Sequence, residues 1–273
     1  MSAQAGRRGL RKPVLRAFAL TAMAATATIA LLVGGCVTVR PPGGLEPSKP
    51  NLPEAARDNT ALGVGYLREG RLDLALEKLR RAVEQDSGYA PAHATLAVAY
   101  AQRGDNDLAE AEYRRALDLA DDPGVRNNFG VFLCGMGKTA EADRYFMDAA
   151  RNHDYPTPEA AWANAGVCAR KAGDLNRAMA DFRQALKLNP DFGDALAPLA
   201  TQSYLSHDYL QSRAYLQRYE QVAQPTAQTL ALGANIERAL GHADAARAYE
   251  LKLIRNFPDS DETAQLLKRN AAP

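Results

Sequence analysis

Residues 162–190 read WANAGVCARKAGDLNRAMADFRQALKLNP, and Gly173 in this stretch marks a position that recurs along the chain. Five glycines and one histidine follow one another at intervals of 34, 33, 36, 34 and 34 residues. They are Gly70, Gly104, Gly137, Gly173, His207 and Gly241. A nearly fixed period of this length is typical of helical-repeat proteins, in which each repeat is a helix pair packed on its neighbours. The period therefore predicts a stacked helical scaffold that holds other molecules.

Other residue types recur with the glycine. Seven residues before it stand the small residues Gly63, Ala97, Gly130, Gly166, Ala200 and Ala234. Nine residues after it stand Leu79, Tyr113, Phe146, Phe182, Leu216 and Glu250. We expect the small residues to let two helices approach closely, and the large apolar residues to fill the gap between pairs. The glycine is expected to end the first helix in the left-handed conformation, which His207 adopts only at a cost of about 1 kcal/mol.

This pattern resembles the tetratricopeptide repeat. Its usual positions are occupied in the opening stretch by Trp162, Ala165, Gly166, Gly173, Ala178, Phe182, Ala185 and Pro190. The resemblance implies an all-α, right-handed superhelical solenoid of about six repeats over residues 54–273. Tyr219 and Glu250 are off the pattern, so the fifth and sixth units match less well. Asp259–Glu262 predicts the start of a short capping helix, Thr263–Asn270. The alternative is a helical bundle without repeats.

The N-terminal 35 residues differ from the rest of the chain. Basic residues from Arg7 to Arg16 precede the apolar run Ala17–Val33, which indicates a bacterial secretory signal over residues 1–35. Val33-Gly34-Gly35-Cys36 resembles a lipobox, so we expect Cys36 to be acylated and to become the mature N-terminus. An uncleaved membrane anchor is the alternative. Val37 after the cysteine favours the outer membrane, by resemblance to lipoprotein sorting signals. Residues 36–53, with five prolines, read as a semi-extended tether.

The charge balance and the motifs of the chain argue against catalysis and against nucleic-acid or metal binding. Removal of residues 1–35 leaves 28 basic and 32 acidic side chains, which does not suit nucleic-acid binding. The four histidines are scattered and form no metal-ligand set. Gly135–Thr139 contains part of a phosphate-binding loop, but Phe132 stands where that motif requires glycine. We therefore expect a protein that is not an enzyme, without cofactor, metal or small-molecule substrate.

Cys134 and Cys168 lie on the predicted first helices of adjacent repeats. In an oxidising periplasm two such cysteines can form a disulfide. They can equally be two small buried apolar residues. Both readings remain open at the level of sequence.

In tetratricopeptide arrays the first helices line the concave face. By that resemblance, the positions three, six and ten residues before the repeat glycine face a groove. In the first three units these include Thr60, Val64, Leu67, Ala94, Val98, Ala101, Asn127 and Val131. A mostly apolar groove suits an amphipathic helix or an extended hydrophobic segment. The alternative is that neighbouring repeats or the tether pack against these residues.

Three segments indicate a particular family among tetratricopeptide-repeat proteins. They are Asn127–Leu133, the link His153–Glu159 and the ending Leu253–Ser260. With the lipobox-like segment and the tether, they resemble the PilF/PilW family of type IV pilus biogenesis lipoproteins. The family implies a pilotin, lipid-anchored at the periplasmic face of the outer membrane, that binds secretin subunits and promotes their localisation and multimerisation. An adaptor lipoprotein for peptidoglycan enzymes or for outer-membrane-protein assembly is the alternative.

Overall fold

The computed structural model describes residues 51–271. The predicted signal segment, Cys36 and the tether up to residue 50 lie outside the described residues, as do residues 272 and 273. The first helix begins at Leu52, two residues before the expected start of the repeat domain. Asn51 caps this helix through its side chain, and Pro53 lies in its first turn.

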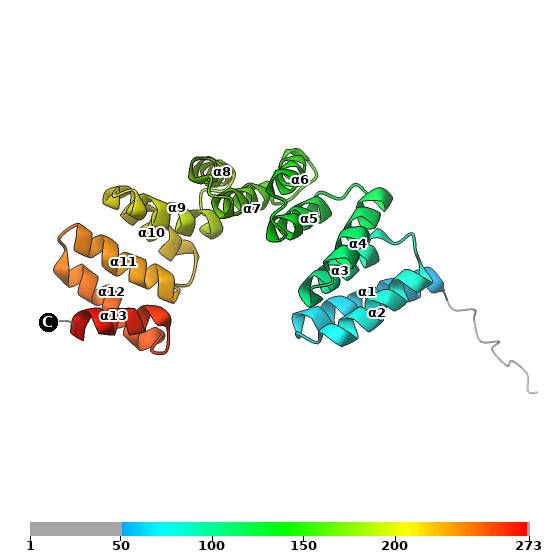
Figure 1. Cartoon of the computed structure of the whole chain (residues 1–273), viewed down its shortest axis with the longest axis horizontal. Coiled ribbons are helices and arrows are strands. Elements are labelled where there is room, and N and C mark those ends of the chain that lie inside the picture. The colour runs from blue at the N-terminus through cyan, green and yellow to red at the C-terminus, as the bar shows by residue number, and fades with distance from the viewer. Residues whose placement is uncertain (1–50, 272–273) are drawn as a thin grey trace, which may run out of the picture. The chain divides into compact units, whose positions relative to one another are not determined.

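Within residues 51–271 the chain folds into thirteen α-helices and no strand, as predicted for an all-α protein (Figure 1). Twelve of these helices form six successive pairs, and α13 follows the last pair. Their bounds are α1 Leu52–Arg68, α2 Leu72–Gln85, α3 Ala90–Arg103, α4 Asn106–Leu119, α5 Pro123–Gly135, α6 Thr139–Arg151, α7 Pro158–Lys171, α8 Leu175–Leu188, α9 Gly193–Leu205, α10 Tyr209–Val222, α11 Ala227–Ala239, α12 Ala243–Asn256 and α13 Asp261–Ala271. None of them is both long and apolar enough to cross a bilayer.

The recurrent glycine ends the first helix in five of the six pairs, as predicted. All five repeat glycines have a positive φ, between 71° and 87°. At the first turn, the Gly70 N–H donates to Leu67 O, and the next residue, Arg71, donates to Tyr66 O at 2.9 Å. This pattern satisfies the last carbonyl groups of α1. His207 takes the same left-handed place with a φ of 62°, which confirms the expected exception.

Within a pair, the small residue of the first helix touches the large residue sixteen positions later. A Cβ added to Gly63 would lie 2.5 Å from Leu79 Cγ. The corresponding distance from Gly166 to Phe182 Cε1 is 2.9 Å. Phe182 is also fully buried, in a cluster with Ala178 and Leu199. Because the glycines carry no side chain, the ring or isobutyl group occupies the space between the two backbones.

The irregular positions of the last two units have a packing explanation. In the sixth unit the close pair is Gly233 and Tyr249, with 2.6 Å from an added Cβ to Tyr249 Cε1. The contact has therefore moved one position toward the N-terminus on each helix, so Glu250 leaves the interior and pairs with Arg238. In the fifth unit Tyr219 is buried, and its ring lies beside Gly193, where there is no side chain to displace it.

The predicted C-terminal helix is present as α13. The Thr263 N–H donates to Ser260 Oγ at 3.2 Å, which caps its first turn. Leu266 packs into a buried cluster with Leu230 of α11 and Leu253 of α12. This helix thus covers the end of the sixth pair in the manner of a further first helix.

Candidate partner-binding groove

The residues predicted to line the groove differ in how far they are open. Val64, Leu67, Ala94, Val98 and Ala101 are half-buried. Val131 on α5 is the most open of the set, with 48% of its surface exposed. The structure therefore leaves an apolar but shallow stripe along the first helices of the first three units.

Two of the predicted groove residues are buried, which corrects the expectation that they face a partner. Thr60 is 6% exposed, and its hydroxyl donates to Ala56 O of its own helix at 2.7 Å. Asn127 is 7% exposed, and its Oδ1 accepts from Asn164 Nδ2 on α7 at 2.9 Å. Asn127 thus connects the third and fourth units. In both cases the polar side chain already makes a hydrogen bond within the protein.

Part of the stripe is also occupied by neighbouring repeats. Leu67 and Ala101 pack against the buried cluster that contains Leu79 and Leu96. Val98 packs against the cluster of the second and third units. Val64 and Val131 belong to no such cluster, so they are the predicted residues best placed to contact another molecule.

Next to Val131, an aromatic group stiffens the third unit. Phe132 lies 5.6 Å from Tyr113 and 6.2 Å from Phe129, measured between ring centroids. The Arg114 guanidinium lies over the Phe129 ring at 5.4 Å. These contacts bury the rings and fix α5 relative to α4, so Val131 is presented from a rigid element.

A hollow on the other face of α1 was not predicted. It has a volume of about 730 Å³. Its lining residues are Asp58, Ala61, Leu62, Gly65, Tyr66, Glu69 and Arg71. Leu62 is 50% exposed, whereas Thr60 and Gly63 nearby are buried. Leu62 is a large apolar residue outside the recurrent positions of the repeat, three places before Gly65. This was the feature of the sequence that could have indicated the hollow.

The two cysteines come together between the third and fourth units. The structure joins Cys134 of α5 and Cys168 of α7 by a disulfide, with their Cα atoms 5.7 Å apart. This separation lies in the usual range for disulfides. Both residues also belong to one buried apolar cluster, so the two readings of the sequence are compatible in geometry.

One buried carboxylate lies close to this region. Asp181 on α8 is 5% exposed, and its Oδ2 has no hydrogen-bond partner among the described residues. Arg177 Nε lies 3.6 Å away, but the same guanidinium also pairs with Asp143 of α6. Burial raises the pKa of Asp181 to about 6, against an opposing effect from Arg177.

The described residues hold no group of three or more His, Cys, Asp or Glu side chains arranged to bind a metal ion. The conspicuous features of this part of the chain are instead repeats, half-open apolar side chains and one disulfide. Such surfaces recognise other proteins.

Comparison with known proteins agrees with this architecture. The tetratricopeptide-repeat family matches residues 66–128 and residues 159–192. The type IV pilus assembly protein PilF of Pseudomonas aeruginosa is 32% identical over 237 residues, which cover 86% of this chain and 93% of the relative. The chain belongs to the PilF/PilW family.

Solved structures of the PilF/PilW family share the fold. The structure of Pseudomonas aeruginosa PilF has a TM-score of 0.70 at 29% identity and covers 81% of this chain and 100% of its own. The structure of PilW, a widely conserved type IV pilus biogenesis factor, has a TM-score of 0.68 at 33% identity, with coverages of 78% and 98%. An uncharacterised Haemophilus influenzae protein is 33% identical over 123 residues, or 45% of this chain and 69% of the relative.

Proposed function

We propose that this PilF/PilW-family chain acts in type IV pilus biogenesis as a pilotin. Acylation at Cys36 anchors it to the periplasmic face of the outer membrane, and the repeat domain binds a secretin subunit. Membership of the family supports the role in pilus biogenesis, since its relatives PilF and PilW are pilus assembly and biogenesis factors. The lipobox-like sequence before Cys36 supports the anchor.

The single observation that carries the binding site is the apolar pair of half-buried Val64 on α1 and exposed Val131 on α5, neither of which is packed in a buried cluster. A secretin subunit exposes apolar, membrane-destined surface and unpaired strand edges before it assembles, and such edges aggregate. An apolar groove that includes these valines can cover a segment of that kind without catalysis. A lipid anchor and tether then keep the bound subunit at high effective concentration near the membrane.

The test is the double variant Val64→Asp, Val131→Asp, expressed as the full chain in the native cell. We expect loss of heat-resistant secretin multimers on immunoblots, because two carboxylates in the stripe would have to be desolvated by an apolar ligand. The matched control is Leu108→Asp with Leu188→Asp. These leucines are 48% and 47% exposed but lie on second helices, so this variant keeps normal multimers.

Normal multimers with a folded Val64→Asp, Val131→Asp protein would place the binding site elsewhere. The anchor is tested separately by Cys36→Ser, which we expect to leave the repeat domain folded but to remove it from the outer-membrane fraction. Crosslinking in cells from Val131 distinguishes the pilotin from the adaptor lipoprotein. A secretin adduct is expected, whereas a peptidoglycan hydrolase or an assembly factor would contradict the proposal.

A further inference from the structure

Polar side-chain contacts join one helix pair to the next at a recurrent place. The residue six positions after the repeat glycine, on the second helix, pairs with the beginning of the following unit's second helix. Glu110 of α4 accepts from Lys138 Nζ, just before α6, at 2.7 Å. Asp143 of α6 pairs with Arg177 of α8. One guanidinium nitrogen of Arg213, on α10, lies 3.5 Å from Nδ1 of His242, which comes just before α12. In three units, this position therefore contacts the following second helix.

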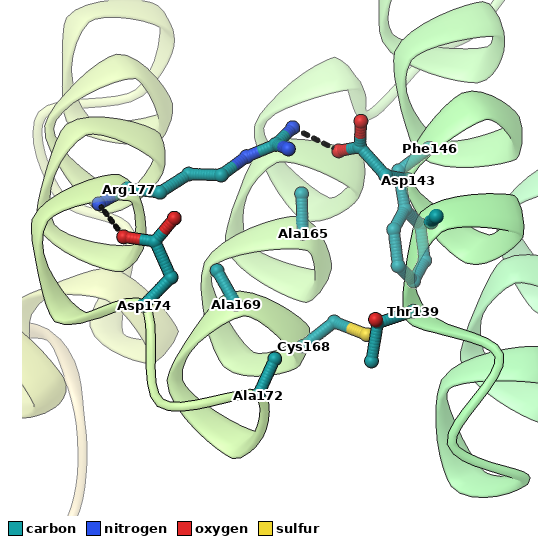
Figure 2. Close-up of a pocket in the computed structure, with 10 residues that line it drawn as sticks. Thr139, Asp143, Phe146, Ala165, Cys168, Ala169, Ala172, Asp174 and Arg177 are labelled. Atoms are coloured by element: carbon teal, nitrogen blue, oxygen red, sulfur yellow. Dashed lines mark hydrogen bonds and ion pairs between the residues drawn. The ribbon is translucent and has the colours of Figure 1, made fainter.

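Figure 2 shows this contact between the third and fourth units. Thr139, Asp143 and Phe146 of α6, at positions two, six and nine after Gly137, form one wall of a hollow of about 200 Å³. Residues of α7, α8 and the turn between them form the rest of the wall, and Arg177 points across to Asp143. This face of a second helix is thus the place where the next pair packs.

The equivalent face of α12 is open within residues 51–271. Ala243, Arg247 and Glu250 stand two, six and nine positions after Gly241 and line a hollow of about 490 Å³. Leu251 and Ile254 line the same hollow and are 58% and 36% exposed. At the position of Ile254, three of the five earlier units carry large apolar residues that are half-buried against the following pair. These are Val83, Leu117 and Leu186.

The charges beside this hollow are basic. Glu250 is already paired with Arg238 and with Arg269 of α13, so its charge is compensated. Arg247 makes no ion pair with any of the described residues, although it holds the position from which Glu110, Asp143 and Arg213 contact the following unit. An incoming helix complementary to this face needs a carboxylate opposite Arg247 and apolar side chains opposite Leu251 and Ile254.

We propose that the face of α12 formed by Arg247, Leu251 and Ile254 binds an acidic amphipathic helix of a partner protein. The helix completes a seventh pair, with α13 as the first member and the partner's helix as the second. Burial of the two apolar side chains supplies affinity, and the carboxylate at Arg247 supplies the choice of partner. This surface is at the opposite end of the repeats from Val64, so it does not depend on the proposed secretin groove.

The test uses the full chain in detergent and two fluorescent synthetic peptides of about 16 residues, long enough for four helical turns. Both carry the same leucine-rich stripe, but one has Glu and the other Lys on the flanks of that stripe. We expect the acidic peptide to bind at least tenfold more tightly, as measured by anisotropy. Arg247→Glu is expected to invert the preference, and Leu251→Asp to weaken both peptides at least tenfold.

The matched control is Arg183→Glu, an exposed arginine of α8 ten positions after its repeat glycine, which is expected to change neither affinity. Equal binding of both peptides, no saturable binding, or an unchanged preference in Arg247→Glu would overturn the proposal. Analytical sedimentation of the chain without peptide tests separately whether two copies associate. Self-association that Leu251→Asp abolishes would make this face a contact between two copies instead of a partner site.

Discussion

Gly130 of α5 lies so close to Phe146 of α6 that a Cβ on the glycine would stand 2.7 Å from Cε1 of the ring. Phe146 is 1% exposed and belongs to the cluster that also contains both cysteines. The ring can move only by displacing this cluster, since protein interiors have few voids. The absence of one methyl group therefore sets the distance between the two helices of the third unit.

We predict that Gly130→Ala destabilises the protein although alanine is the better helix former. Overpacking costs about 1–3 kcal/mol, against a propensity gain of about 1 kcal/mol. Gly65→Ala, inside α1, is the control, because an added Cβ there meets nothing within 4 Å. Urea unfolding followed by circular dichroism is expected to show a net loss only for Gly130→Ala. Similar losses in both variants would refute the packing argument.

His207→Gly is expected to stabilise the protein by about 0.5–1 kcal/mol, because glycine adopts a positive φ without a Cβ clash. The gain is limited by loss of the contact between His207 Nδ1 and the Tyr209 hydroxyl, which are 2.7 Å apart. The reciprocal change, Gly173→Ala at a φ of 85°, is expected to cost about 1 kcal/mol or more. Thermal unfolding measures both variants, and a destabilised His207→Gly would show that the side-chain contact outweighs the strain.

Asp181 makes stability depend on pH in the direction opposite to most carboxylates. Its pKa of about 6 in the folded chain exceeds the ordinary value of 3.8, because burial disfavours the charge. Asp143 of α6 and Asp174 before α8 raise this pKa further, and Arg177 lowers it. The folded state thus binds the proton more tightly, so this group's contribution to unfolding free energy increases as pH falls from 7 toward 4.

Asp181→Asn is expected to stabilise the protein at pH 7.5, on the order of 1 kcal/mol, by removing a buried charge. The difference between variant and wild type is expected to shrink as pH falls through 6 toward 4. Urea midpoints at several pH values measure this difference, in which the titration of all other groups cancels. A difference that does not change with pH would show that the carboxylate does not titrate in this window.

We predict that Cys134 and Cys168 are oxidised in the protein isolated from the envelope, with no thiol open to alkylation before reduction. A bond closing a loop of 34 residues is expected to stabilise the chain by about 2–4 kcal/mol. Reductant should therefore lower the urea midpoint of the wild type and leave the Cys134→Ala, Cys168→Ala variant unaffected. Mass spectrometry that finds both thiols alkylated in the native protein would contradict this prediction.

Much of the fold could be predicted because its rules are local. The turn at Gly70 needs a left-handed residue regardless of distant contacts, and the pair Gly166 and Phe182 is separated by only sixteen positions. Burial in the groove was harder to predict, because the hydrogen bond of Asn127 is to Asn164, in the next unit. Periodicity gives the face of a helix on which a residue lies, but not whether a neighbour already covers it.

The sequence by itself determined the repeat, the helix ends, the exceptional conformation of His207 and the family resemblance, because all of these depend on residues at fixed offsets. Only the tertiary structure decided which positions remain open. It buried Thr60 and Asn127, left Val131 exposed, and moved the contact of the sixth unit to Gly233 and Tyr249. It also left Leu251 beside Arg247, which makes no ion pair within residues 51–271. Exposure depends on how one helix pair packs against the next, and that packing is a property of neighbouring units together.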